Sequence, residues 1–62
     1  MAVERYIVRW LKDGLIVDID HFSELKEAER HAMGQIKVYR ALDFASSAII
    51  YDEDGKERMR VY

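Results

Sequence analysis

The chain has 62 residues, of which 50% are hydrophobic and 35% are charged, and its formal net charge is −2. This mixture predicts one small globular domain over residues 1–62 and argues against a disordered chain. Cysteine is absent, which excludes disulfides and thiolate zinc sites, and no stretch approaches the roughly 20 apolar residues of a transmembrane helix. Because charges, and no apolar signal core, follow the first residues, we expect a cytoplasmic protein without a membrane segment.

The first predicted structure is a β-hairpin. From Arg5 to Lys12 and from Leu15 to Asp20, side chains of β-forming residues alternate with period two, which is typical of strands. Asp13-Gly14 lies between these runs and is the dipeptide most characteristic of a two-residue hairpin turn.

A two-residue turn fixes which residues face each other across this hairpin. It sets three cross-strand pairs: Trp10 with Val17, Arg9 with Asp18, and Val8 with Ile19. Two pairs are then apolar and the third joins opposite charges. A three-residue loop would instead set Arg9 against Val17. It would also set Val8 against Asp18, and we therefore favour the two-residue turn.

An amphipathic helix is predicted next. Ser23 is the expected N-cap, and Glu24 and Glu27 suit the positive end of the helix. One stripe of apolar side chains marks the face that packs on a sheet: Leu25, Ala28, Ala32, Ile36 and Tyr39.

Gly34 leaves two interpretations of this helix open. Either the helix continues to about Ala41 with an exposed glycine, at a cost of about 1 kcal/mol relative to alanine, or it ends at Gly34. In the second case residues 35–40 become an extra strand. We favour the long helix because the apolar stripe continues through Ile36 and Tyr39.

A second hairpin is predicted from residues 47–52 and 57–62, around Asp54-Gly55. A two-residue turn gives four pairs: Ile50 with Met59 and Ala48 with Val61 on the core side, and Tyr51 with Arg58 and Ile49 with Arg60 on the other side. A bulged three-residue loop would exchange the two faces of the strand at residues 47–52.

These elements predict an α+β fold of the type ββαββ. Two hairpins form a four-stranded antiparallel sheet, and one helix packs on one face. The strand order 2-1-3-4 keeps every neighbour antiparallel and avoids a parallel crossover.

Four motifs resemble a group of short bacterial ββαββ proteins classed as domains of unknown function. The motifs are Tyr6-Ile7-Val8, Asp13-Gly14-Leu15 with Asp18, Glu24-Leu25-Lys26-Glu27-Ala28, and Ile49-Ile50-Tyr51-Asp52-Glu53-Asp54-Gly55. The resemblance covers nearly the whole chain and implies the same fold. It transfers no functional residue, because the family carries no accepted activity.

The polar residues predict no enzyme. Asp18, Asp20, His21 and Glu24 form the densest polar group, but their spacing matches no recognised metal site. His31 is most simply a surface partner of Glu27. Ser46-Ser47 has no activating base placed beside it by the sequence. We therefore expect no catalytic residue, no metal and no cofactor.

The sheet face away from the helix is the strongest functional candidate. It is predicted to carry Ile7, Arg9, Leu11, Ile16, Asp18, Ile49, Tyr51, Arg58, Arg60 and Tyr62. A face left in water should be polar, whereas this one mixes branched aliphatic residues with tyrosine and arginine, which are typical of protein interfaces.

This face predicts a non-enzymatic protein-interaction or self-associating module. A chain of this size is close to the lower limit of autonomous stability, so we expect a homodimer built through the face, or another protein partner. The alternative is a nucleic-acid-binding regulatory protein, with bases stacked on Tyr51 and Tyr62 and phosphates held by Arg58 and Arg60. The acidic net charge argues against that alternative.

Overall fold

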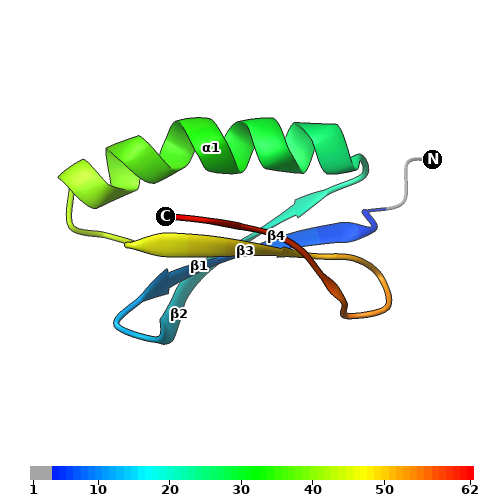
Figure 1. The fold of residues 1–62 in the computed structure, drawn as a ribbon, viewed down its shortest axis with the longest axis horizontal. Helices are drawn as coiled ribbons and strands as arrows, with labels where there is room; N and C mark the ends of the chain where they lie inside the picture. Colours follow the sequence, from blue (N-terminus) through cyan, green and yellow to red (C-terminus); the bar gives the residue numbers. More distant parts are fainter. Residues whose placement is uncertain (1–3) are drawn as a thin grey trace.

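The computed structural model describes residues 4–62, so residues 1–3 of the predicted domain lie outside the described part. Within residues 4–62 the elements are β1 (Tyr6–Lys12), β2 (Leu15–Phe22), α1 (Leu25–Ala41), β3 (Ser47–Tyr51) and β4 (Glu57–Val61) (Figure 1). They form one four-stranded sheet in the order β2-β1-β3-β4, with every neighbouring pair antiparallel. The predicted α+β class, the ββαββ order and the strand order are all confirmed.

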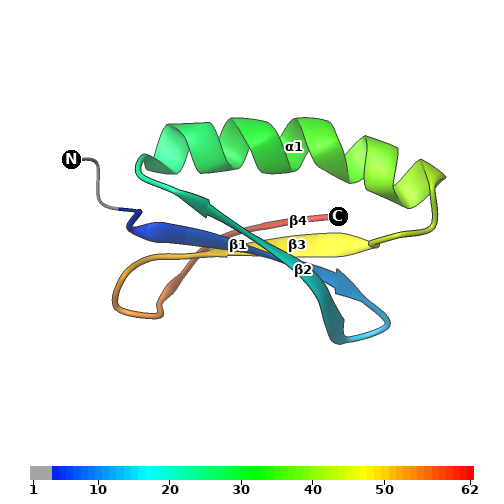
Figure 2. The same ribbon diagram turned by 180° about the vertical axis from the view of Figure 1, so that it is seen from behind.

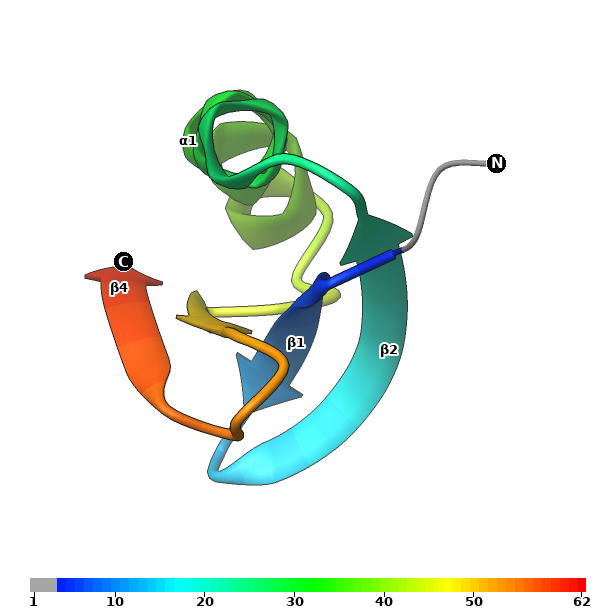
Figure 3. The same ribbon diagram turned by 90° about the vertical axis from the view of Figure 1, so that its right-hand side faces the viewer.

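The helix covers one face of the sheet. Viewed with α1 nearly end-on, the sheet curves so that β2 and β4, its two edges, rise toward the helix layer (Figure 3). From behind, β2 crosses in front of the other strands and climbs from the first turn to the start of α1 (Figure 2). We call the sheet surface turned away from α1 the outer face.

The core lies between α1 and the sheet. Its largest fully buried side chains are Trp10, Ile50 and Val8, which are contributed by the two central strands. The helix contributes Ala28 and Ala32, whose small side chains let its backbone approach the sheet closely, together with a buried Ile36.

The long helix is confirmed. Gly34 lies in the interior of α1 and is exposed, and a Cβ added there would meet nothing within 4 Å. The predicted N-cap at Ser23 is wrong, since Glu24 occupies that position without a side-chain capping bond. The reason is that β2 continues to Phe22, so Ser23 is used to turn the chain. Glu24 is then the residue whose carbonyl accepts the first helical bond, from Ala28.

The first hairpin has the predicted two-residue turn. Lys12 pairs with Leu15 across Asp13-Gly14. The two turn residues have φ angles of 52° and 81°, a left-handed conformation that aspartate tolerates and glycine adopts without strain.

Beyond the turn, the register of the first hairpin differs from the prediction. A bulge at Val17 shifts the later residues, so that Trp10 faces Asp18, Arg9 faces Ile19 and Val8 faces Asp20. The predicted pairs of Trp10 with Val17, Arg9 with Asp18 and Val8 with Ile19 are therefore wrong. The shift gives the buried Trp10 indole a partner, because its Nε1 donates a 2.8 Å hydrogen bond to Asp20 Oδ2.

The second hairpin differs from the prediction at two places, and the two differences compensate for each other. The loop has three residues, since Asp52 donates its backbone N–H to the Lys56 carbonyl, and Gly55 has a φ of 79°. A bulge at Arg58 then restores the register. Three predicted pairs are confirmed: Ile50 with Met59, Ala48 with Val61, and Ile49 with Arg60. The fourth is wrong, because Tyr51 faces Glu57 in place of Arg58.

Candidate interaction surface

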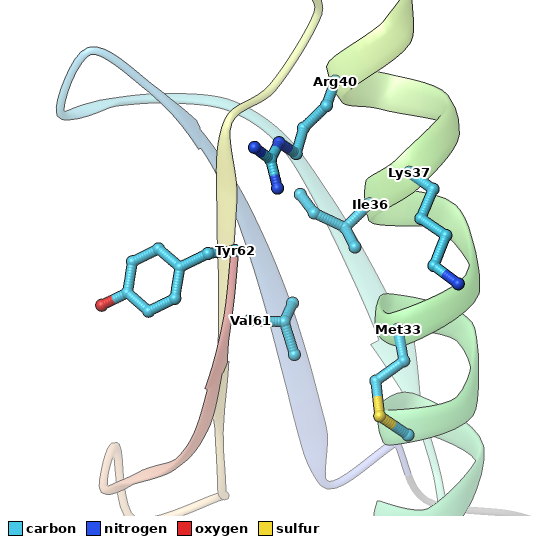
Figure 4. A pocket seen from close by; sticks show the side chains of 6 residues that line it. All are labelled: Met33, Ile36, Lys37, Arg40, Val61 and Tyr62. Carbon is cyan, nitrogen blue, oxygen red and sulfur yellow. The ribbon is translucent and has the colours of Figure 1, made fainter.

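The outer face brings together most of the residues predicted for it. Side chains alternate along each strand, and those that alternate with the buried Val8, Trp10, Ala48 and Ile50 point outward. Pairing across the sheet places the following residues on the outer face: Ile7, Arg9, Leu11, Ile16, Ile49, Tyr51 and Arg60. Tyr62 follows β4, and its ring points away from α1 (Figure 4).

Two predicted members are placed elsewhere. Asp18 faces Trp10 and therefore belongs to the helix side of the sheet. Arg58 lies in the β4 bulge, outside the pairing of Tyr51 with Glu57. Ile19 and His21 lie on the outer face and were missed, because the bulge at Val17 reverses the faces of this half of β2. Alternation alone carries no signal for that reversal.

The centre of the outer face is already covered by its own side chains. Ile49 is only 7% exposed although no helix lies above it. It stands between Arg9 and Arg60 in one row across the sheet. The Arg9 guanidinium lies 4.5 Å from the centre of the Tyr51 ring, a cation–π contact that occupies both side chains.

The other two arginines of this region are held by carboxylates. Arg60 Nη2 lies 2.7 Å from Glu57 Oε1, and this hydrogen bond holds the pKa of the Glu57 carboxyl below its usual range. Arg58 Nη1 lies 3.4 Å from Asp52 Oδ2. The pKa of Asp52 is lowered first by the Lys56 backbone N–H, which donates to Oδ1, and then by Asp54 and Arg58.

Among the strands, β2 exposes the most apolar side chains. Four of its residues project into solvent: Leu15 (71% exposed), Ile16 (52%), Val17 (37%) and Ile19 (44%). In the sheet formed by residues 4–62, β2 is also an edge, so its outward backbone groups have no strand beside them. An apolar edge strand is a template for pairing with another chain.

A polar contact fastens the far end of β2 to the helix. Asp20 Oδ2 accepts the Trp10 indole hydrogen bond and also lies 3.4 Å from His31 Nε2 on α1. The His31 ring in turn packs against Phe22 at a centroid distance of 5.1 Å. Asp20 therefore has a structural role. His21 is directed to the opposite face, where its Nδ1 lies 4.0 Å from Glu4 Oε2.

A groove lies between α1 and the other edge strand, β4 (Figure 4). Its volume is about 440 Å³, and it is lined by Met33, Ile36, Lys37, Arg40, Val61 and Tyr62. The apolar side chains come from both elements, and the two cations come from the second half of the helix. Sequence reasoning missed the groove because it depends on how far α1 stands from β4.

The comparisons with known proteins found no family model, no curated protein and no solved structure that matches this chain. The resemblance to short bacterial proteins therefore stays a prediction. Within residues 4–62, no helix combines the length and the apolar character needed to cross a bilayer. In the same described range, no three His, Asp or Glu side chains gather closely enough to hold a metal ion.

Proposed function

We propose that the protein is a small non-enzymatic interaction module that associates with copies of itself in the cytoplasm. Its contact surface is β2 together with the adjoining part of the outer face, which we call the β2 surface: Ile7, Leu11, Leu15, Ile16, Val17 and Ile19. The observation that carries the proposal is the run of exposed apolar side chains on an edge strand.

The size of the chain supports this proposal. A 62-residue domain buries about 60% of the surface that its unfolded chain exposes, which leaves a small margin of stability. The chain has no cysteine to add a cross-link. Burying the β2 surface between copies adds apolar contact that the single helix does not supply, because Leu15, Ile16, Val17 and Ile19 remain exposed.

The electrostatics of the outer face favour protein over nucleic acid as the partner. Arg58 and Arg60 are neutralised by Asp52 and Glu57, and Arg9 covers the Tyr51 ring. Nucleic acid would have to displace these contacts before it gained phosphate or stacking interactions.

Sedimentation velocity over a range of concentrations tests the proposal. We expect the wild-type mass to rise above that of one chain, and Ile19→Lys to shift the equilibrium toward monomer because it places a charge on the β2 surface. Val38→Lys is the matched control, since Val38 is similarly exposed but lies on the helix. A wild-type chain that stays monomeric at millimolar concentration would overturn self-association. Retention on single-stranded nucleic acid at low salt, lost on Arg9→Ala with Arg60→Ala, would favour the alternative.

A further inference from the structure

We propose that β2 of one copy pairs with β4 of a second copy, head to tail, so that the two sheets become one continuous sheet. This inference rests on the proposed self-association and specifies which surfaces meet. The acidic, apolar strand β2 is the ligand, and the groove between α1 and β4 of the next copy receives it.

The strand order permits this arrangement without reversing either copy. Each strand in the order β2-β1-β3-β4 is antiparallel to the next, so β2 and β4 run in opposite directions. When a second copy continues the sheet and is turned only by the twist of the sheet, its β2 is therefore antiparallel to β4 of the first copy. Both helices then lie on the same side of the joined sheet.

The register within one copy shows which residues meet when the rows continue. One row on the helix side runs Asp18–Trp10–Ala48–Val61, and the adjacent row on the outer face runs Ile19–Arg9–Ile49–Arg60. Continuing the first row places Asp18 of the second copy beside Val61, which lines the groove. Continuing the second row places the exposed Ile19 beside the aliphatic stem of Arg60.

Charge favours the pairing of β2 with β4 over the two symmetric pairings, β2 with β2 and β4 with β4. The β2 strand carries Asp18 and Asp20 and contains no lysine or arginine. Arg58 and Arg60 beside β4 are paired with Asp52 and Glu57, so the positive charge at this edge comes from Lys37 and Arg40 in the groove. Two β2 strands brought together would repel through their acids, and two β4 edges would bring the Lys37 and Arg40 side chains of two grooves together. Pairing β2 with β4 joins opposite signs.

The groove supplies the receiving charges. Among residues 4–62, neither Lys37 nor Arg40 belongs to any of the ion pairs, which use Lys12, His21, His31, Arg58 and Arg60. Both are exposed on the helix beside apolar groove walls (Figure 4). An aspartate on the helix side of an added strand lies next to these cations, while the backbone groups of the two edges pair.

A charge-reversal pair tests the proposal. Variant one is Lys37→Glu with Arg40→Glu, and variant two is Asp18→Lys. Each variant alone sets like charges across the interface, so we expect each self-association constant to fall at least about tenfold in sedimentation experiments. Mixing the two variants restores opposite signs in both possible contacts, and we expect association to return toward the wild-type level. Circular dichroism and Trp10 fluorescence confirm that each variant is folded.

Matched controls separate this interface from a general effect of net charge. Lys26→Glu with Arg30→Glu makes the same change in the first half of the helix, and Glu27→Lys makes the same change as variant two. We expect both controls to associate as wild type. If the wild type associates but variant one behaves as its control, the head-to-tail inference is wrong while self-association stands. In that case a homodimer through the outer face, or through two β2 strands, becomes the explanation. A wild type without association removes both proposals.

Discussion

The two hairpins of this protein use the same devices and end with different outcomes. Each has a turn containing an Asp-Gly pair and a bulge a few residues away. In the first hairpin the bulge at Val17 adds one residue and reverses the faces of the remaining strand. In the second, the longer loop and the bulge at Arg58 cancel, so the core pairs remain in place. Which side chains of a strand face the core thus depends on the total number of extra residues in the hairpin, counted over the loop and the bulge together.

The hairpins also differ in how they meet solvent. The second carries internal ion pairs, Arg58 with Asp52 and Arg60 with Glu57, which satisfy its charges locally. The first exposes aliphatic side chains along β2 and directs its carboxylates to the helix side. The charges of the second hairpin are therefore satisfied locally, whereas the first hairpin leaves apolar side chains exposed for contact with another chain.

Removing the anchor of the first hairpin should have the largest effect on stability. Trp10 is fully buried and contacts the ring of Tyr39 on α1. We expect Trp10→Ala to lower the free energy of unfolding by about 3–5 kcal/mol. Met59→Ala in the second hairpin should cost less, since Met59 is only partly buried. Urea unfolding followed by far-UV circular dichroism measures both, and equal losses would contradict this ranking.

An engineered disulfide tests the register of the first hairpin directly, because the chain has no cysteine of its own. Arg9→Cys with Ile19→Cys places two thiols opposite each other on one face, so oxidation should be fast and should stabilise the fold by about 2–3 kcal/mol. Arg9→Cys with Asp18→Cys places the thiols on opposite faces and should resist closure. Faster oxidation of the second pair would restore the register predicted from the sequence.

The register of the first hairpin also places Asp20 where it accepts the Trp10 hydrogen bond. Asp20→Ala leaves the buried Trp10 N–H without its acceptor, and we expect it to lower the free energy of unfolding by about 1–3 kcal/mol. Asp18→Ala is the matched change on the same face, and it removes only a local bond to the Ile19 backbone N–H. Trp10 fluorescence should shift in the first variant and remain unchanged in the second. The same response in both variants would argue against a role specific to Asp20.

The smallest effect is expected from acid, and it concerns the second hairpin. The pKa values of Asp52 and Glu57 are lowered from their ordinary values of 3.8 and 4.5. Their contribution is therefore fully present above those ordinary values and is lost as pH falls through the lower folded values. This loss begins at about pH 5 to pH 3. Over that range the urea midpoint of unfolding should fall less in Asp52→Asn than in the wild type. An unchanged pH dependence would show that the carboxylate contributes nothing measurable.

Local chemistry explains how much of the fold could be predicted. The alternation from Arg5 to Lys12, the Asp13-Gly14 turn and the apolar stripe of α1 each act over a few residues, so they can be read without knowing the rest of the chain. The exposed Gly34 was also interpretable, because the stripe continues on either side of it. The central part of the candidate surface, including Ile7, Arg9 and Ile49, follows from the same alternation.

The remaining features depend on contacts between distant residues. No local sequence pattern shows that Val17 lies outside the pairing. The bulge stabilises the fold because Trp10 is buried and its indole N–H then reaches Asp20. The exposure of Ile19 follows from the same shift. The groove arises because α1 and β4, which are not adjacent in the sequence, meet along the edge of the sheet.

By itself, the sequence determined the elements and the first turn, because period and turn chemistry act within a few residues. The strand order followed from the element order together with the rule that neighbours stay antiparallel without a parallel crossover. Only the tertiary structure decided which residue in each hairpin is extra and therefore which side chains of β2 face solvent. The physical reason is that a bulge is a small local disturbance. Burying an indole N–H without a partner is a larger cost, and only the assembled core requires that it be avoided.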